Sequence, residues 1–267
     1  MLRTWVRPSA AYNPLATVRK KFVISIATMN AAKQAAGYKA IDNHLLPSFK
    51  YVGIGSGSTV VYCVERIAQL REKVPEINSM YFVPTGYQSR QLIVDAGLPL
   101  MEIDQFSAGE LDIVFDGADE VDSQLNCIKG GGGCQFQEKL VGKCSKKFIA
   151  VVDDSKISQR LGEHWLQGIP IEVVPSAHKK VAVDLKRLGA SKVTLRSGGK
   201  SKAGPMVTDN ANFVLDAYFG EIAPERVAEL DRSIKLLVGV VETGLFDYAD
   251  EVYIGRTSGP TEILTRK

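Results

Sequence analysis

In the first half of the chain, segments whose hydrophobic residues recur at helical spacing alternate with short apolar runs. The predicted order is helix, strand, helix, strand. Short apolar runs that end at a glycine, a proline or a charged residue predict strands. These predicted strands are Tyr51–Gly55, Met80–Val83, Leu111–Phe115 and Lys147–Val152. Apolar residues at helical spacing predict helices at Ala31–Leu45, Val60–Leu70 and Gln88–Ala96. This alternation indicates an α/β fold, Rossmann-like, with a mainly parallel sheet.

The pattern changes after Gly162 to one typical of a second, smaller α+β unit. Its predicted strands are Ile171–Val174, Lys192–Leu195 and Asn212–Asp216, and its predicted helices are Ala177–Leu188 and Glu225–Ile234. A closing strand at Glu251–Ile254 is expected to return to the first sheet. We therefore expect an N-terminal extension, a catalytic Rossmann-like α/β domain and a smaller α+β domain, covering residues 1–28, residues 29–162 with 249–267, and residues 163–248.

The composition is that of an ordinary globular protein, with 45% hydrophobic and 24% charged residues. A net charge of +3 is too small to indicate a nucleic-acid partner. The apolar run Phe22–Met29 is far too short to span a bilayer. We therefore expect no nucleic-acid and no membrane partner.

The positive charge is concentrated near the N-terminus. Residues 1–28 carry five basic residues and no acidic one. Because the whole chain carries +3 and this segment +5, the rest carries a net charge of −2. A basic segment without acidic residues is either an organelle transit peptide or an extension, disordered and without a targeting role. Met29 is also an alternative start, so the protein is expected in the cytoplasm or, with a transit peptide, in an organelle.

The cysteines and histidines are too dispersed to indicate a zinc site or a disulfide framework. They are Cys63, Cys127, Cys134, Cys144, His44, His164 and His178. We expect four reduced thiols and no metal.

A loop rich in glycine and hydroxyl residues follows the first predicted strand, at Gly53–Thr59. Ser58 occupies the position where a dinucleotide fingerprint requires its last glycine, and no Walker-type motif is present. Backbone amides at a helix N-terminus, with the hydroxyls of Ser56, Ser58 and Thr59, are suited to a monophosphate. The alternative is a helix cap whose glycines allow tight strand–helix packing.

A second cluster of polar residues and glycines follows the third predicted strand. It comprises Asp116–Glu120, Lys129–Gly133 and Gln137–Lys139. Four successive glycines are costly to order, so such a run indicates a close approach to the backbone. Carboxylates, an ammonium group and exposed amides together favour a site for a small anionic substrate. Taken singly, Asp116 and Asp119 are also typical of turns, and Glu138 of a solvated helix face.

Seven segments of the chain closely resemble the type A family of ribose-5-phosphate isomerases, in order and at similar spacing. They are Gly53–Thr59, Asp116–Glu120, Ile128–Gly133, Gln137–Lys139, Gly168–Val173, Ala203–Asn210 and Gly239–Phe246. The resemblance runs from about Ala32 to nearly the C-terminus. It implies interconversion of D-ribose 5-phosphate and D-ribulose 5-phosphate in the non-oxidative pentose phosphate pathway. In this family the reaction is a 1,2-proton shift through an enediolate, without metal or organic cofactor.

The resemblance also implies roles for individual residues. Glu138 matches the general base, and Asp116 matches the residue that handles a proton during ring opening. Lys129 and the amides of Gly130, Gly131 and Gly132 would stabilise the enediolate oxygen. Asp119 would fix substrate hydroxyls and orient Lys129.

For the phosphate group, the residues that match the binding loop are Ser56, Gly57, Ser58 and Thr59. Lys33 and Lys156 match lysines that contribute to substrate binding, although a solvated helix lysine is the alternative for Lys33. Gly117 and Ala118 are expected to contact the substrate as well.

Two other functions remain as alternatives. A sugar-phosphate sensor domain would share the fold and the phosphate loop, but it would normally be joined to a basic helix-turn-helix. A dinucleotide-dependent oxidoreductase is disfavoured by Ser58. By analogy with the family, the small-molecule sugar phosphate is the only ligand expected, and the chain is expected to form a homodimer or homotetramer.

Overall fold

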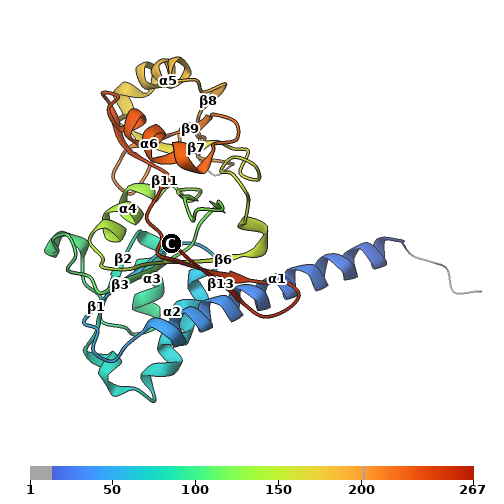
Figure 1. The fold of residues 1–267 in the computed structure, drawn as a ribbon, viewed down its shortest axis with the longest axis vertical. Helices are drawn as coiled ribbons and strands as arrows, with labels where there is room; N and C mark the ends of the chain where they lie inside the picture. Colours follow the sequence, from blue (N-terminus) through green and yellow to red (C-terminus); the bar gives the residue numbers. More distant parts are fainter. Residues whose placement is uncertain (1–13, 201) are drawn as a thin grey trace, which may run out of the picture.

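The structure is a computed structural model that describes residues 14–200 and 202–267, with side chains from residue 26 onward (Figure 1). Three sheets form its framework. The largest has the strand order β2-β1-β3-β6-β12-β13, in which only β13 runs antiparallel to its neighbour. Its strands are β1 (Tyr51–Ile54), β2 (Tyr81–Pro84), β3 (Ile113–Asp116), β6 (Phe148–Asp153), β12 (Glu251–Gly255) and β13 (Glu262–Thr265).

Helices cover both faces of this sheet because successive strand residues point to opposite sides. In β6, Ile149 and Val151 pack with one face, whereas Ala150 and Val152 pack with the other. The first face is covered by α1 (Pro14–His44), α2 (Val60–Arg71) and α3 (Tyr87–Asp95). The second face is covered by α4 (Gln135–Lys143) and a small sheet of the short strands β4 (Glu120–Val121), β5 (Cys127–Ile128) and β11 (Leu245–Phe246).

The remaining sheet belongs to the α+β part of the chain, at the top of Figure 1. Its antiparallel strands follow the order β10-β7-β9-β8 and pack against two helices through a separate hydrophobic core. These elements are β7 (Ile169–Val173), β8 (Lys192–Leu195), β9 (Phe213–Tyr218), β10 (Val240–Thr243), α5 (His178–Arg187) and α6 (Val227–Lys235). Short 3-10 helices connect elements throughout the chain: η1 (Pro75–Ser79), η2 (Ile103–Gln105), η3 (Asp154–Lys156), η4 (Pro175–Ala177) and η5 (Pro224–Arg226).

The strand order creates a crevice at one edge of the large sheet. From β1 the chain passes through α2 to β2 on one side, while β3 pairs on the other side of β1. Ligands bind in open α/β sheets where the strand order reverses in this way, beyond the carboxyl ends of the strands. The loop after β1 and the residues after β3 therefore lie on either side of the switch point.

The α/β class and its mainly parallel sheet are as predicted, and β12 does return to the first sheet by pairing with β6. The first helix differs from the prediction because it begins at Pro14. No glycine or proline interrupts residues 15–36, so the helical segment extends through residues 14–28 of the predicted extension. Residues 1–13, the rest of that extension, lie outside the described residues.

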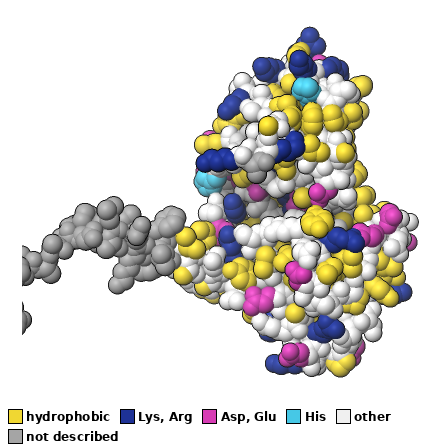
Figure 2. All heavy atoms as spheres, turned by 180° about the vertical axis from the view of Figure 1, so that it is seen from behind, with side chains coloured by type: hydrophobic (Ala, Val, Ile, Leu, Met, Phe, Trp, Pro, Cys, Tyr) yellow, Lys and Arg dark blue, Asp and Glu magenta, His cyan; other side chains and the backbone are white. Residues whose placement is uncertain are grey.

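Several short strands were not predicted, namely β4, β5, β10, β11 and β13. The strands β4, β5 and β11 have two residues each, too short to show a periodic pattern, and β10 and β11 pair with segments distant in sequence. Hydrophobic, positive and negative side chains are interspersed on the face shown in Figure 2. Among the described residues, no helix combines the length and the apolar character needed to cross a membrane.

Candidate active site

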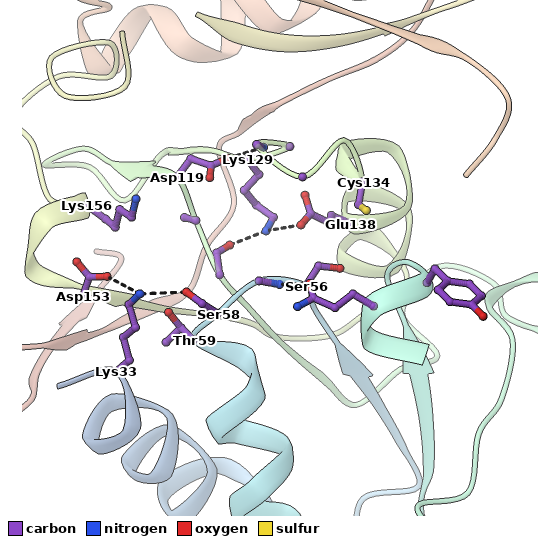
Figure 3. Close-up of a pocket in the computed structure, with 18 of the residues that line it drawn as sticks. Lys33, Ser56, Ser58, Thr59, Asp119, Lys129, Cys134, Glu138, Asp153 and Lys156 are labelled. Atoms are coloured by element: carbon purple, nitrogen blue, oxygen red, sulfur yellow. Dashed lines mark hydrogen bonds and ion pairs between the residues drawn. The ribbon is translucent and has the colours of Figure 1, made fainter. Parts of the chain in front are cut away.

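A cleft of about 400 Å³ opens at the switch point of the large sheet (Figure 3). Its walls come from the loop after β1, the segment between β3 and α4, and the α+β part of the chain. The lining residues are Lys33, Ser56, Gly57, Ser58, Thr59, Tyr87, Gln88, Gly117, Ala118, Asp119, Lys129, Gly130, Gly131, Gly132, Cys134, Glu138, Asp153, Lys156 and Asp209.

Tight packing between β1 and β3 brings the first two segments together. A Cβ atom on Gly53 would lie 2.7 Å from Cγ2 of Val114, and one on Gly55 would overlap the carboxylate of Asp116. The Asp116 Oδ1 atom accepts hydrogen bonds from the amides of Ser56 at 3.2 Å and Gly117 at 2.7 Å. These contacts explain why glycine is required at positions 53 and 55.

Asp116, Lys129 and Glu138 form a buried charge cluster, of which Lys129 and Glu138 line the cleft (Figure 3). The Lys129 Nζ atom is 2.9 Å from Oδ2 of Asp116 and 3.2 Å from Oε1 of Glu138. It also donates to the carbonyl oxygen of Gly117 at 2.5 Å. Asp116 is fully buried beneath Lys129 and is not among the described residues that line the cleft. One cation thus serves two carboxylates in a site shielded from water.

Burial and the neighbouring charges shift the pKa of all three groups. Desolvation raises the pKa of Glu138 to about 8, with Lys129 opposing the shift and Asp116 and Asp119 adding to it. Desolvation also raises the pKa of Asp116, again against the opposing effect of Lys129. Burial by itself would lower the pKa of Lys129, but the two carboxylates outweigh it and raise that pKa, so the ammonium stays charged. Glu138 can therefore exchange a proton near neutral pH.

One carboxylate oxygen of the cluster is free for a further hydrogen bond. Within the described part of the chain, Oε2 of Glu138 is buried without a hydrogen-bond partner, whereas Oδ2 of Asp116 has the Lys129 ammonium 2.9 Å away. Buried carboxylate oxygens normally have such partners, so Oε2 of Glu138 is a candidate for contact with a ligand or water.

The four glycines form a tight turn beside this cluster. Gly130 and Gly133 have φ values of 92° and 82°, which side chains rarely adopt. A Cβ atom on Gly131 would lie 2.6 Å from Oδ1 of Asp119. A Cβ atom on Gly132 would meet open space, so only three of the four positions require glycine for packing or backbone conformation.

Two expectations for this segment need correction. The Gly131 amide donates to Oδ2 of Asp119 at 2.6 Å and so is not available to an enediolate oxygen. Lys129 is oriented by Asp116, Glu138 and the Gly117 carbonyl rather than by Asp119. The carboxylate of Asp119 reaches the glycine turn because the pairing of β4 with β5 places the residue before β4 next to the segment after β5.

The loop after β1 and the first helix form the opposite end of the cleft (Figure 3). The Lys33 Nζ atom donates to Oγ of Ser58 at 3.0 Å and lies 3.6 Å from Oδ2 of Asp153. Among the described residues, the backbone amides of Ser58 and Thr59 have no hydrogen-bond acceptor. Lys156 also lines the cleft and has no carboxylate within ion-pair distance in the described part of the chain. Two lysines and free amides at a helix N-terminus suit a phosphate group.

Sequence reasoning missed five residues that line the cleft: Tyr87, Gln88, Cys134, Asp153 and Asp209. The Gln88 Oε1 atom accepts from the Gly57 amide at 2.9 Å, and Oδ2 of Asp209 accepts from the Tyr87 amide at 3.1 Å. Asp209 lies within Ala203–Asn210, one of the seven segments that carry the family resemblance, so the sequence could have indicated it as a site residue. Nothing in the sequence distinguishes Gln88 in this way. Burial raises the pKa of Cys134 to about 12, so this thiol stays protonated.

Lys139, the last residue of the Gln137–Lys139 motif, points away from the cleft. Its Nζ atom lies 2.8 Å from Oε1 of Glu242 and 3.1 Å from Oδ1 of Asp231. It therefore ties α4 to β10 and α6. The Nζ atoms of Lys129 and Lys139 lie 5.5 Å and 5.1 Å from the centroid of the Phe246 ring.

Across the described residues, no group of three or more His, Cys, Asp and Glu side chains is arranged to hold a metal ion. The residues that could bind a ligand are the charge cluster, the glycine turn and the phosphate-type loop.

A model of the family described as ribose 5-phosphate isomerase A (phosphoriboisomerase A) matches residues 81–259 of the chain. The chain is also similar to full-length relatives. A protein named ribose-5-phosphate isomerase from Candida albicans is 52% identical over 91% of this chain and 99% of its own length. One of the same name from Saccharomyces cerevisiae is 54% identical over 88% of this chain and 92% of its own length.

Solved structures of isomerases with this name share the fold. A D-ribose-5-phosphate isomerase in complex with phospho-erythronic acid superposes with a TM-score of 0.81 at 34% identity, covering 89% of this chain and 99% of the other. Ribose 5-phosphate isomerase A from Methanocaldococcus jannaschii gives a TM-score of 0.77 at 33% identity, covering 88% of this chain and 98% of the other.

Proposed function

Because this chain belongs to the ribose 5-phosphate isomerase A family, we propose that its cleft interconverts D-ribose 5-phosphate and D-ribulose 5-phosphate through an enediolate. As a member of that family it is an aldose–ketose isomerase of pentose phosphates. The observation that carries the proposed mechanism is Glu138, a buried carboxylate whose pKa is about 8 and which lies 3.2 Å from the Lys129 ammonium. The relatives reported above are all described as isomerases, so the sensor-domain alternative gains no support.

Glu138 acts as the general base. It takes the proton from carbon 2 of the aldose; the C–H electron pair forms the C1=C2 bond, and the carbonyl electron pair moves onto oxygen 1 to give the enediolate. The same carboxyl group then returns the proton to carbon 1, and the hydroxyl proton of oxygen 2 passes to oxygen 1 as the carbonyl group forms at carbon 2. One carboxylate suffices because the two carbons are bonded neighbours. A base is most effective when its pKa is near the working pH, which the raised pKa of Glu138 satisfies.

Lys129 stabilises the negative charge that develops on the enediolate oxygen. It is held at a fixed position by Asp116, Glu138 and the Gly117 carbonyl, so it needs no reorganisation during the reaction. The amide of Gly132, which donates no hydrogen bond among the described residues, is a second donor at this end of the cleft. Asp116 is buried beneath Lys129, so it takes part in ring opening through this ammonium, 2.9 Å away, rather than by direct contact.

The phosphate group of the substrate binds at the other end, against Ser56–Thr59, Lys33 and Lys156. This arrangement uses the amides of Ser58 and Thr59 and two ammonium groups. It leaves the carbonyl end of the sugar directed toward Glu138.

The isomerase mechanism is tested by incubating purified protein with ribose 5-phosphate in metal-free buffer with a chelator, and measuring ketose formation. We expect turnover that added metal does not increase, because Lys129 supplies the positive charge. Absence of turnover, or turnover that depends on added metal, would contradict the mechanism.

The phosphate position is tested with Lys33→Met. Hydrogen bonds to charged groups are worth about 1.5–3 kcal/mol, so KM for ribose 5-phosphate should rise by about 10- to 100-fold with a smaller effect on kcat. Lys39→Met is the matched control, since Lys39 is on the same helix but outside the cleft. An unchanged KM for Lys33→Met would place the phosphate elsewhere.

We further propose that the chain forms a homodimer or homotetramer through the segment 163–248, which light scattering of the purified protein would test. Exposed apolar side chains on this segment support the proposal, with Leu166, Leu236 and Val238 at 65%, 78% and 79% exposure.

Both interpretations of residues 1–28, an organelle transit peptide and an extension without a targeting role, remain predictions. The protein is proposed to act in the cytoplasm, or in an organelle if residues 1–28 are a transit peptide. N-terminal sequencing of the mature protein distinguishes these cases.

A further inference from the structure

Arg196, directly after β8, reaches from the α+β part of the chain to the back of the glycine turn. Its Nη1 atom donates to the carbonyl oxygens of Gly130 at 2.8 Å and Gly131 at 3.0 Å. Arg196 is not among the described residues that line the cleft, so it contacts the turn from the side opposite the cleft.

The guanidinium group is itself held in place. Its Nε and Nη2 atoms donate to the two carboxylate oxygens of Asp216 on β9, at 2.9 and 2.5 Å. The side chains of Arg196 and Asp216 are only 13% and 11% exposed. Such a bidentate, shielded pair fixes both the position and the plane of the guanidinium group.

This contact, together with the hydrogen bond from the Gly133 amide to the Gly130 carbonyl at 2.9 Å, fixes which way two peptide groups face. In a trans peptide, the C=O of one residue and the N–H of the next point in opposite directions. With the Gly130 carbonyl on Arg196, the Gly131 amide points away and meets Oδ2 of Asp119 at 2.6 Å. With the Gly131 carbonyl also on Arg196, the amide of Gly132 likewise points away from Arg196, on the side of the cleft that Gly132 lines.

The two amides therefore have different tasks. That of Gly131 holds Asp119, while that of Gly132 has no hydrogen-bond partner in the described part of the chain. Glycine peptides can readily turn over, because no side chain restricts φ and ψ. Arg196 opposes such a turn, and its positive charge at the two carbonyls also polarises the peptides and makes their amides stronger donors.

We propose that Arg196 is a positioning residue for the isomerisation: through the carbonyls of Gly130 and Gly131 it directs the Gly132 amide at the developing enediolate oxygen. This inference rests on the proposed function of the cleft. It assigns the α+β part of the chain a part in the chemistry, although Arg196 itself touches no reacting atom.

The test compares Arg196→Met with the wild type in kcat, KM and ligand affinity. Loss of a supporting residue typically costs about 10- to 100-fold, so kcat should fall by this factor while KM for ribose 5-phosphate changes less than about threefold. Affinity for phospho-erythronic acid should fall in parallel, because its carboxylate places negative charge near the enediolate position. Affinity for inorganic phosphate, which probes only the other end of the cleft, should stay unchanged.

Three further variants make the result specific. Arg196→Lys should be intermediate, because one ammonium group cannot reach two carbonyls and also pair bidentately with Asp216. Asp216→Asn should lower kcat in the same direction without altering any residue that touches the turn. Arg66→Met is the matched control, because it removes an Arg–Asp pair, with Asp42, that is remote from the cleft.

The proposal is overturned if kcat of Arg196→Met equals that of the wild type, or if KM and phosphate affinity deteriorate as much as kcat. If Arg196→Met does not fold, Arg196→Lys and Asp216→Asn decide by the same criteria. Failure of the wild type to isomerise ribose 5-phosphate would instead contradict the proposed function, while the affinity for phospho-erythronic acid would still report on Arg196.

Discussion

Replacing Glu138 with Gln is expected to lower kcat by about 10²- to 10⁴-fold, with KM for ribose 5-phosphate kept within a few-fold. The amide has the shape of the carboxyl group but cannot accept a proton at carbon 2. Because Glu138 is only 5% exposed, water is poorly placed to substitute for it. Steady-state kinetics at saturating substrate measure the effect, and activity near that of the wild type would mean that another residue is the base.

The same variant has a defined pH dependence. Glu138 must be ionised to act, and its pKa is raised to about 8, so kcat/KM of the wild type should increase as pH rises through about 8. In Glu138→Gln this increase should be absent. Glu163→Gln, at an exposed carboxylate, is the control that should keep the wild-type profile.

Stability provides an independent check on Glu138. A carboxyl group whose pKa rises from 4.5 in the unfolded chain to about 8 in the folded protein favours folding only while it is protonated. Its contribution is fully present below pH 4.5 and is lost as pH rises through about 8. The free energy of unfolding of Glu138→Gln should therefore exceed that of the wild type by more at pH 9 than at pH 5, as chemical denaturation can measure.

Replacing Lys129 with Met is expected to impair both catalysis and stability. Loss of one oxyanion-stabilising donor costs about 10²- to 10³-fold in kcat. Removal of one member of a buried ion pair costs about 3–5 kcal/mol of unfolding free energy, because Asp116 and Glu138 would remain buried without their shared cation. Kinetics and chemical denaturation measure the two effects separately.

Lys139→Met is the matched control for Lys129→Met. Lys139 is also a buried lysine with two carboxylate partners, and its ammonium group likewise lies over the Phe246 ring. Its loss should lower stability by a comparable amount but reduce kcat far less, since it does not line the cleft. Equal losses of activity in the two variants would show that Lys129 acts only through stability.

The elements that carry the site were predictable because local pattern specifies them. The strand before Gly55 is four residues of apolar sequence closed by glycine, and Asp116 follows a second such run. Parallel strands that leave a switch point must present their carboxyl ends together, so the proximity of Ser56 and Asp116 follows from the strand order. The helix from Gln135 begins one residue after Cys134, and the sequence indicated it only through the alternative interpretation of Glu138 as part of a solvated helix face.

Other residues of the site could not be predicted from local pattern. Tyr87 and Gln88 enter the cleft from the start of α3, far from the glycine motifs, and neither differs in type from ordinary surface residues. Arg196 is one of many basic residues, and its contact with Gly130 joins positions 66 residues apart. Sequence reasoning also assigned the Gly131 amide to the substrate, because backbone direction within a glycine turn has no signal in residue type.

The sequence by itself determined which chemical groups are available: a carboxylate at 138, a cation at 129, a loop of glycines and hydroxyls at 56–59 and glycines that permit a tight turn. Only the tertiary structure decided how these groups share their bonds. Asp116 is buried beneath Lys129, Asp119 takes one glycine amide, and Arg196 leaves another free. The physical reason is that residue type and periodicity act over a few neighbours, whereas pKa, burial and peptide orientation depend on segments brought together from across the chain.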